Sequence, residues 1–417
     1  MTTVLAPELS IDRVRWPDIA HSGRNPIRRK VAELLLRRAM ARLPVRVTTS
    51  TGERMGGGGP ADPHLHLVRP DRFFQRVGVS GLIGFGEAYM AGDWESEDLA
   101  DLLTVMAGNV STLIPAPLQR LRDAVLVVRP GSQDNSVAGA RANIQRHYDL
   151  SNDLFATFLD SSLSYSSALF GADPERSPES LTDGQHRKID RLLDLADVGP
   201  GTRLLEIGTG WGELAIRAAR RGALVTSVTI STEQAVLARQ RIAASGLSDR
   251  AEVRLQDYRE VTGTFDAVVS VEMIEAVGAN RWAEYFGALD RLLAPGGKVA
   301  LQAITMPHDR MLATINTYTW IVKYIFPGGH IPSVTAVRDQ VAATRLEITS
   351  ELGFGRHYAE TLRRWRATFE DHSAEVRALG FDEVFQRMWS LYLAYSEAGF
   401  RSRYLDVVQF GMVRPAG

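Results

Sequence analysis

The sequence predicts an α/β protein: a doubly wound, mostly parallel sheet preceded by a smaller N-terminal α+β domain. From about residue 141, short apolar runs alternate with helical patterns, and a glycine-rich turn follows the first run. This alternation is typical of parallel sheets covered by helices. The expected strands are 202–207, 223–230, 251–255, 265–271 and 298–304. The expected helices between them include 211–221, 232–245 and 281–293.

Composition narrows the class of protein. The chain has 417 residues, of which 45% are hydrophobic and 23% charged, as in soluble globular proteins. A net charge of -1 gives no support for a nucleic-acid partner. The lack of cysteine excludes disulfides, thiolate metal sites and a cysteine nucleophile, and we expect no metal. No apolar stretch is long enough to span a membrane, and the N-terminus is not built like a signal peptide.

The chain divides at a polar stretch. We expect an N-terminal lipid-docking or dimerisation domain over residues 1–130, a linker over 131–145 and a second domain over 146–417. Residues 306–333 mix aromatic, aliphatic and turn residues and would form an apolar lid or tunnel over the strand ends. The alternative is a helix that packs on the core, which is the better interpretation for single residues such as Trp320.

Residues 24–43 form a basic, amphipathic segment. They carry seven basic residues and one acidic residue. Apolar side chains recur at helical spacing, at Ile27, Val31, Leu34, Leu35, Ala39 and Leu43. Such a helix could lie on an anionic membrane surface, or it could be an ordinary surface helix docked on its own domain.

The glycine-rich turn lies in LLEIGTGWGELA, residues 204–215. Gly208, Gly210 and Gly212 would let a ligand approach the backbone, and the following helix offers unpaired N–H groups. Glu206, directly before the turn, would repel a phosphate but suits a cation. S-adenosylmethionine (AdoMet) is a positively charged cofactor without phosphate, so the motif indicates AdoMet and methyl transfer.

A dinucleotide is the alternative ligand for this turn. It requires a carboxylate at the end of the next strand, to bind the ribose. That strand ends in Thr229 and Ser231, so the pattern favours a methyltransferase over a dehydrogenase. Ligands of doubly wound sheets bind at the carboxyl ends of the strands. Four polar segments fall at expected strand ends, namely Glu206 to Gly212, Thr229 to Gln234, Gln256 to Tyr258 and Glu272 to Glu275.

Six motifs occur in one order along the chain. They are HYDLSNDLFATFLDSSLSYSSALF, the glycine turn, VTISTEQ, LQDYRE, VSVEMIEAVG and KYIFPGGHIPS. Together they resemble the cyclopropane fatty acid synthase family, which includes the mycolic acid methyltransferases, over roughly residues 70–410. The resemblance implies the class I AdoMet methyltransferase fold. It also implies methyl transfer to the cis double bond of an unsaturated acyl chain in a membrane phospholipid.

The resemblance implies which residues form the site. The cofactor would be lined by Tyr165, Ser166, Gly208, Gly210, Thr229, Gln234, Gln256 and Asp257, together with Glu206 and Gly212 of the turn. Without the resemblance, Thr229 and Gln234 could be a helix cap and a surface residue, and Gln256 and Asp257 plain turn residues. Glu275 matches the family's active-site glutamate and Tyr358 a tyrosine near the site; each could instead be a hydrogen-bonded residue at the end of an element.

Four departures from the family lie at the expected base, one of them Ala276 in place of the histidine after Glu275. Many members hold a bicarbonate ion as the base, using a cysteine, a glutamate, a histidine, a tyrosine and backbone. Here Ser167 stands for the cysteine and Gln302 for the histidine, while Glu272 replaces a glycine. We therefore do not expect bicarbonate to bind in the usual way. If the segment continues as a helix, Glu272 and Glu275 share one face, and two close carboxylates would raise one pKa.

A changed base would change the product. We expect Glu272, alone or with Glu275, to remove the proton. A hydride shift before that loss gives a methylene group on the acyl chain. The resemblance is to the actinobacterial tuberculostearic-acid members of the family, which are expected to make this precursor of 10-methyl chains. A separate reductase would then reduce the methylene group to a methyl group. The alternatives are a cyclopropane synthase on the same substrate, an inactive AdoMet-fold protein that binds lipid, and a small-molecule methyltransferase. We expect a cytoplasmic protein on the inner membrane face, with a homodimer as a further possibility.

Overall fold

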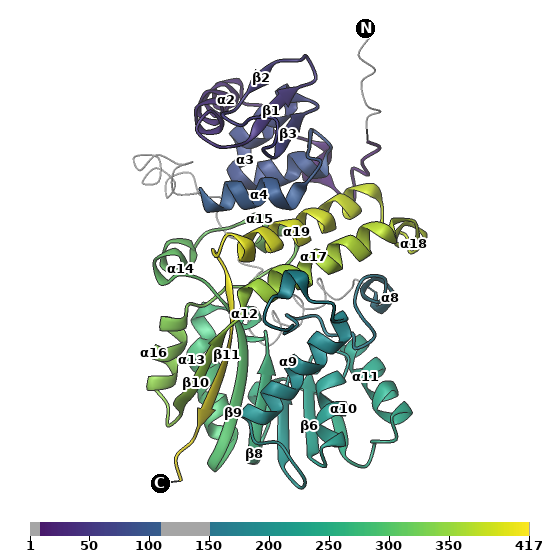
Figure 1. Ribbon diagram of the computed structural model, residues 1–417, viewed down its shortest axis with the longest axis vertical. Coiled ribbons are helices and arrows are strands. Elements are labelled where there is room, and N and C mark those ends of the chain that lie inside the picture. The colour runs from purple at the N-terminus through teal and green to yellow at the C-terminus, as the bar shows by residue number, and fades with distance from the viewer. Residues whose placement is uncertain (1–8, 110–150, 417) are drawn as a thin grey trace. The chain divides into compact units, whose positions relative to one another are not determined.

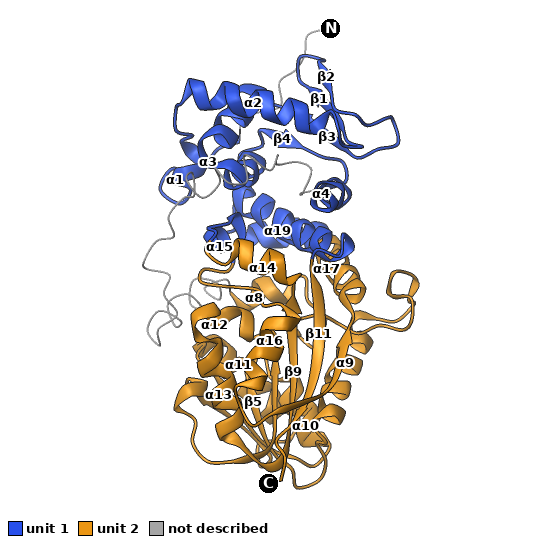
Figure 2. Cartoon of the chain, turned by 90° about the vertical axis from the view of Figure 1, so that its left-hand side faces the viewer, with its two compact units in different colours: residues 1–128, 317–325, 369–404 blue, residues 129–316, 326–368, 405–417 orange. Residues whose placement is uncertain are grey.

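The computed structural model describes residues 9–109 and 151–416, which fold into two compact units (Figures 1 and 2). Unit 1 comprises residues 1–128, 317–325 and 369–404; unit 2 comprises 129–316, 326–368 and 405–417. Unit 1 thus includes two segments that the sequence analysis assigned to the second domain. The predicted linker, 131–145, lies outside the described residues.

Unit 2 contains a seven-stranded sheet in the order β10-β11-β9-β8-β5-β6-β7. The strands from β9 to β7 are parallel, and β11 pairs antiparallel with both β9 and β10, which confirms the predicted doubly wound, mostly parallel sheet. The expected strands correspond to β5 (Arg203–Ile207), β6 (Leu224–Thr229), β7 (Ala251–Leu255), β8 (Phe265–Val271) and β9 (Leu293–Thr305). Strands β10 (Glu347–Gly353) and β11 (Asp406–Val413) were not predicted from the sequence.

Helices cover both faces of this sheet (Figure 1). One apolar cluster contains residues of α9 (Leu181–Leu195), α10 (Glu213–Arg220) and α11 (Thr232–Ala244); the other contains residues of α13 (Trp282–Leu292) and α16 (Val334–Ala342). Leu204 and Leu205 belong to different clusters, because successive side chains of a strand point to opposite faces. The described part of unit 2 also contains the α-helices α8 (Asn152–Ala156), α12 (Ile274–Val277) and α14 (His308–Thr314), and α17 (Gly355–Asp371) begins there.

Unit 1 combines helices with a four-stranded sheet in the order β2-β1-β3-β4. Its strands are β1 (Arg46–Thr49), β2 (Arg54–Met55), β3 (His64–Leu67) and β4 (Trp94–Glu95). Its helices are α1 (Pro17–Ala20), α2 (Pro26–Met40), α3 (Pro70–Met90), α4 (Leu99–Gly108), α15 (Trp320–Tyr324), α18 (Ser373–Ala378) and α19 (Glu383–Arg401). None of the described helices is both long and apolar enough to cross a membrane.

The segment 306–333 is divided between the units, since residues 317–325 belong to unit 1. Trp320 of α15 is buried there, and a Cβ on Gly86 of α3 would lie 2.5 Å from its ring. Such close packing supports the core interpretation for Trp320 itself. The lid over the strand ends stays a prediction.

Candidate active site

Parallel pairing brings the four polar segments to one edge of the sheet. Ile207 of β5 pairs with Val228 of β6 and with Ser270 of β8, and Thr229 pairs with Leu255 of β7. Past the strand ends, Gly208 N–H donates to the carbonyl of Val228 at 3.0 Å. The sequence motifs that follow β5, β6, β7 and β8 therefore lie at neighbouring positions, where ligands of such sheets bind.

The turn after β5 requires its glycines. Gly208, Gly210 and Gly212 have φ angles of 95°, 52° and 90°, in the left-handed region that glycine adopts without strain. A Cβ on Gly208 would lie 2.6 Å from the Met273 side chain, whereas one on Gly210 would meet nothing within 4 Å. The turn leads into α10 at Glu213, so the open side of Gly210 lies near unpaired helix N–H groups.

Glu206 is a buried carboxyl group at the end of β5. It accepts a hydrogen bond from the Ser227 hydroxyl at 2.5 Å. Burial raises the pKa of Glu206 to about 8, against the opposing effects of Ser227 and the Lys188 charge. A cation bound beside it would stabilise the ionised form. The carboxyl group and the glycine turn thus fit AdoMet, which is cationic and lacks phosphate.

The other predicted cofactor residues at the strand ends are held by local hydrogen bonds. The Thr229 hydroxyl donates to Gln234 Oε1 at 3.0 Å, and Gln256 Nε2 donates to the carbonyl of Glu260 at 3.0 Å. Asp257 is buried and accepts from Arg259 at 2.8 and 2.7 Å. Gln256 and Asp257 thus have the turn roles that the sequence offered as alternatives. The alternatives for Thr229 and Gln234, a helix cap and a surface residue, are wrong, because Ser231 is the N-cap of α11 and Gln234 is buried. The roles of these residues in cofactor binding stay predictions.

Tyr165 and Ser166 lie in the segment between α8 and α9. The Tyr165 ring stacks on Trp365 with centroids 5.3 Å apart. Ser166 is buried and accepts a hydrogen bond from Lys188 Nζ at 2.6 Å. Both side chains are therefore fixed by packing or by hydrogen bonds.

Glu272 is the centre of the predicted base site. Its Oε1 accepts hydrogen bonds from Ser167 N–H at 3.0 Å and from Gln302 Nε2 at 2.7 Å, and its Oε2 accepts one from the Tyr358 hydroxyl at 2.7 Å. Four of the five predicted residues of the base site thus meet at one carboxyl group. Burial raises the pKa of Glu272; the three hydrogen bonds and the Lys188 charge oppose that rise.

The expected helix through Glu272 and Glu275 is wrong. Glu272 N–H donates to the carbonyl of Gln302 at 2.8 Å, so its backbone still pairs with β9. Its φ of 52° lies in the left-handed region, which is uncommon for a residue with a side chain. Helix α12 begins only at Ile274. The two glutamates are therefore brought close by a turn rather than by one helical face.

Glu275 is the fifth predicted residue and has a different environment. Its Oε1 accepts a hydrogen bond from Ile304 N–H, and its buried Oε2 has no hydrogen-bond partner among the described residues. Burial raises the pKa of Glu275 to about 8, and the charge of Glu272 adds to the rise. At neutral pH this carboxyl group is mostly protonated, whereas Glu272 has the donors that favour an ionised carboxylate.

Lys188 is a site residue that was not predicted from the sequence. This lysine of α9 is buried, and the charges of Glu272, Asp160 and Glu206 act on it. Burial lowers its pKa to about 8, while the three carboxylates raise it. The available signal was helical spacing: Lys188 adjoins Ile189 and precedes Leu192 by four residues, on the buried face of α9 that also carries Gln185. A lysine in such a stripe indicates a buried cation.

The base site does not fit a bicarbonate ion. The Ser167 N–H, the Gln302 amide and the Tyr358 hydroxyl already donate to Glu272. An added anion would compete for these donors and would lie beside a second negative charge. The side-chain carboxylate occupies the donors that an exogenous anion would need.

A buried carboxyl group beside a glycine turn, at the carboxyl edge of this sheet, defines a class I AdoMet-dependent methyltransferase. The family described as mycolic acid cyclopropane synthetase matches residues 135–410. The chain therefore belongs to this family, and the resemblance that the motifs indicated is confirmed.

Similar proteins cover nearly the whole chain. Tuberculostearic acid methyltransferase UfaA1 of Mycobacterium tuberculosis is 54% identical over 419 residues, which cover 99% of this chain and 98% of that protein. The cyclopropane-fatty-acyl-phospholipid synthase of Escherichia coli is 33% identical over 381 residues, 88% of this chain and 92% of that one.

A solved structure supports the fold and the cofactor. Mycolic acid cyclopropane synthase CmaA1, complexed with SAH and CTAB, superposes with a TM-score of 0.60 and 32% identity, over 66% of this chain and 98% of that one. The predicted fold, cofactor and enzyme class are confirmed: the chain is an AdoMet-dependent methyltransferase of the cyclopropane fatty acid synthase family.

Proposed function

We propose that this enzyme methylates the cis double bond of an oleoyl-type phospholipid chain and forms a methylene branch, the precursor of a 10-methyl chain. The observation that carries the proposed proton removal is the Glu272 carboxylate, held by Ser167, Gln302 and Tyr358, which would serve either a methylene or a cyclopropane product. The name of the 54% identical relative, a tuberculostearic acid methyltransferase, supports the same product.

The protein's own residues have three tasks in this reaction. Glu206 and the turn at Gly208 and Gly210 would hold AdoMet, which supplies a methyl group to the alkene. The new carbon–carbon bond leaves a cation on the acyl chain, and the nearby Glu272 carboxylate stabilises that charge. A hydride then moves from the methylated carbon to the cationic carbon. Glu272 takes a proton from the new methyl group, and the electrons of that C–H bond form the methylene double bond.

The cyclopropane alternative differs in one step. Without the hydride shift, loss of a proton from the same methyl group closes a three-membered ring. A base on a fixed side chain removes the proton in either case, so the timing of the hydride shift decides the product.

Labelled substrate distinguishes these outcomes. The enzyme is given AdoMet and vesicles of oleoyl phospholipid carrying deuterium on both alkene carbons, and the released fatty acids are analysed by mass spectrometry and NMR. A methylene product with both deuterium atoms on one neighbouring carbon is expected. A cyclopropane that keeps one deuterium on each carbon would replace the proposal with the alternative. AdoMet binding without any lipid product would indicate an inactive, lipid-binding protein.

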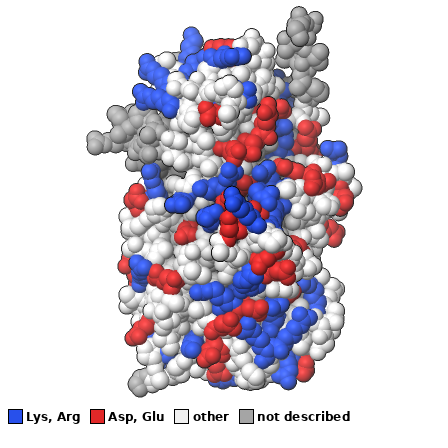
Figure 3. Space-filling model, in the orientation of Figure 1, with Lys and Arg blue, Asp and Glu red and all other residues white. Residues whose placement is uncertain are grey.

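We also propose that α2 docks the enzyme on an anionic phospholipid surface. Its exposed face carries Ile27, Val31 and Leu34, which are 75%, 51% and 51% exposed. Their spacing of four and three residues aligns them in one stripe. Exposed basic residues flank the stripe, among them Arg28 and Lys30, and Figure 3 shows basic side chains grouped over α2. This combination is typical of helices that lie in a membrane interface.

Vesicle flotation tests this docking. Replacing Ile27, Val31 and Leu34 by serine should release the protein from vesicles that contain anionic phospholipid. Val236→Ser on α11 is the matched control, because Val236 is also an exposed apolar helix residue, at 48%. Equal flotation of the triple variant and the wild type would contradict the role of α2.

Three further predictions concern the partners and the location of the enzyme. A methylene branch must gain two hydrogen atoms to become a methyl branch, so a separate reductase that supplies a hydride would act on the product. We place the enzyme in the cytoplasm, on the inner face of the membrane. A homodimer also stays a prediction, and light scattering of the purified protein tests it.

A further inference from the structure

A chain of three hydrogen bonds leads from α9 to the proposed base. Arg191 Nη1 donates to Gln409 Oε1 at 2.6 Å, and Gln409 Nε2 donates to Gln302 Oε1 at 2.9 Å. Gln302 Nε2 then donates to Glu272 Oε1 at 2.7 Å. Both glutamines are completely buried, and they are direct cross-strand partners on β9 and β11. The chain therefore connects a cation on α9 with Glu272 through the interior of the sheet.

The order of donors and acceptors along this chain is forced by its two ends. An amide has a donor end and an acceptor end of nearly equal size, so a buried glutamine can point either way. Arginine can only donate, and an ionised carboxylate can only accept. The main-chain carbonyl of Lys188 also accepts from Gln409 Nε2, at 3.3 Å. With Arg191 at the other end, Gln409 must present its oxygen to Arg191 and its nitrogen to Gln302. Gln302 must then present its nitrogen to Glu272.

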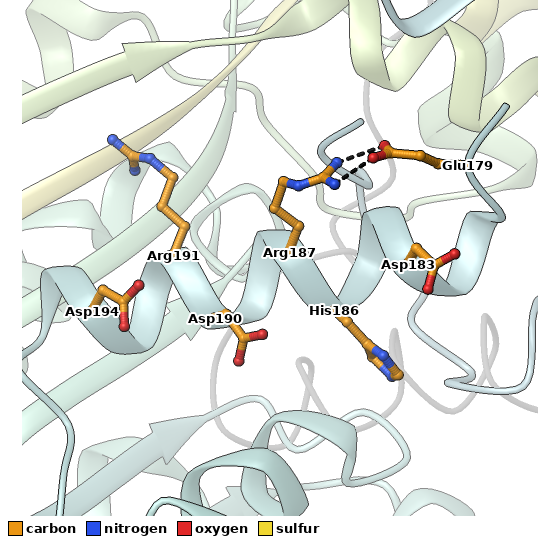
Figure 4. Close-up of a pocket in the computed structure, with 7 residues that line it drawn as sticks. All are labelled: Glu179, Asp183, His186, Arg187, Asp190, Arg191 and Asp194. Carbon is orange, nitrogen blue, oxygen red and sulfur yellow. Dashed lines mark hydrogen bonds and ion pairs between the residues drawn. The ribbon is translucent and has the colours of Figure 1, made fainter. Parts of the chain in front are cut away.

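Arg191 is available for this role because it has no competing ion pair among the described residues. Figure 4 shows Arg187 and Arg191 pointing to the same side of α9, while His186 and Asp190 point to the other side. Arg187 is paired with Glu179, at 2.6 Å. The hydrogen bond of Arg191 goes to Gln409 instead.

We propose that Arg191 and Gln409 are positioning residues that keep the donor end of the Gln302 amide on the Glu272 carboxylate. A reversed Gln302 would place its oxygen against Oε1 of Glu272 and would favour the protonated carboxyl group. The inference rests on the proposed role of Glu272 as the base. Other groups that act on Glu272 are Lys188, Glu275, Tyr358 and the Ser167 N–H. Of these, Lys188 contacts the hydrogen-bond chain, through its main-chain carbonyl, which accepts from Gln409 Nε2 at 3.3 Å.

Gln409→Glu reverses the order with little change of shape. The new carboxylate accepts from Arg191, an ion pair that preserves packing, but it cannot donate to Gln302. Gln302 must then turn its nitrogen toward residue 409 and its oxygen toward Glu272. We expect the pKa of Glu272 to rise, so that kcat near neutral pH falls about tenfold for each unit of rise. The KM for AdoMet should not change, because the chain ends at the base.

Three further variants separate positioning from general effects. Arg191→Lys keeps a donor and should retain most of the activity. Arg191→Met leaves the Lys188 carbonyl to orient Gln409, so it should shift the pH profile in the same direction as Gln409→Glu but by less. Arg187→Met is the matched control on the same side of α9 and should leave the pH profile unchanged. In a Gln302→Met background, Gln409→Glu should have almost no further effect. An undiminished effect there would show a direct charge effect and would overturn the proposal.

A readout without turnover distinguishes this inference from the proposed function. Infrared difference spectra between the wild type and Glu272→Gln report the ionisation of Glu272 directly, and the same titration is repeated for Gln409→Glu. An unchanged Glu272 pKa in a folded Gln409→Glu protein overturns the positioning role. A raised pKa with an unchanged kcat profile supports the positioning role and refutes Glu272 as the base. Thermal unfolding checks that each variant is folded.

Discussion

Tyr358→Phe removes one hydrogen bond from the proposed base and leaves the rest of the ring in place. The Tyr358 hydroxyl lies 2.7 Å from Glu272 Oε2. A hydrogen bond to a charged group contributes about 1.5–3 kcal/mol, which corresponds to about 1–2 pKa units. Ser167 and Gln302 still donate to the other oxygen, so we expect the lower value, about one unit.

The direction of the change follows from the charge. The hydrogen bond stabilises the ionised carboxylate, so its loss raises the pKa of Glu272. The reaction needs the ionised form, and the acid limb of kcat should therefore move to higher pH by about one unit. At pH values on the acid limb, kcat of the variant should be about tenfold lower than that of the wild type. At high pH it should approach the wild-type value.

The assay measures kcat against pH with oleoyl phospholipid vesicles and saturating AdoMet, with gas chromatography of the products. Tyr395→Phe serves as the control, since Tyr395 is a half-exposed tyrosine of unit 1. An acid limb that coincides with the wild type would refute the assignment of Glu272. A loss of equal size at every pH would instead indicate that Tyr358 orients the substrate.

Three other substitutions test the buried charges. The raised pKa of Glu275 makes the free energy of unfolding of the wild type fall as pH rises. Glu275→Gln should therefore stabilise the protein more near pH 8 than near pH 5, by a difference on the order of 2–3 kcal/mol in the free energy of unfolding. Thermal unfolding at the two pH values measures this difference. Lys188→Met should raise the pKa of Glu272 and lower kcat about tenfold near neutral pH; an unchanged pH profile would contradict it. Glu206→Gln should weaken AdoMet binding about tenfold in calorimetry, and an equal Kd would exclude a cofactor role.

The central part of the fold was predictable because its signals are local. Strands buried on both faces are continuous apolar runs, so β5 and β8 are visible in the sequence. The last two strands are different. β10 alternates between exposed and partly buried residues, and β11 carries Gln409 inside an apolar stretch. Long helices separate these strands along the chain, so no alternation of strands and helices marks them.

The base site was predictable as a set of residues but not as a geometry. Its residues come from segments far apart in sequence, and only the β8–β9 register places Gln302 opposite Val271 and next to Glu272. The conformation of Glu272 depends on that pairing, so a helical extrapolation from Glu275 failed. Lys188 was missed because it stands among basic residues of α9 that are not buried, Arg187 and Arg191, although its spacing to Leu192 is that of the buried face.

The last prediction concerns bicarbonate. Because the Glu272 carboxylate is part of the chain, the enzyme should not need a bound anion as its base. The Glu272 carboxylate accepts hydrogen bonds from three donors. The backbone of Glu272 has a φ of 52°, a conformation that favours glycine. Glu272→Gly should relieve the backbone strain and leave the donors of Ser167, Gln302 and Tyr358 open to a small anion.

Removal of carbon dioxide and bicarbonate should leave kcat of the wild type unchanged, because its base is part of the chain. The Glu272→Gly variant should be nearly inactive under the same conditions and should regain activity as bicarbonate is added, with saturation. Formate, which resembles the lost carboxylate, should rescue it as well, whereas chloride should not. A wild-type enzyme that loses activity without bicarbonate would show that the anion, rather than Glu272, takes the proton.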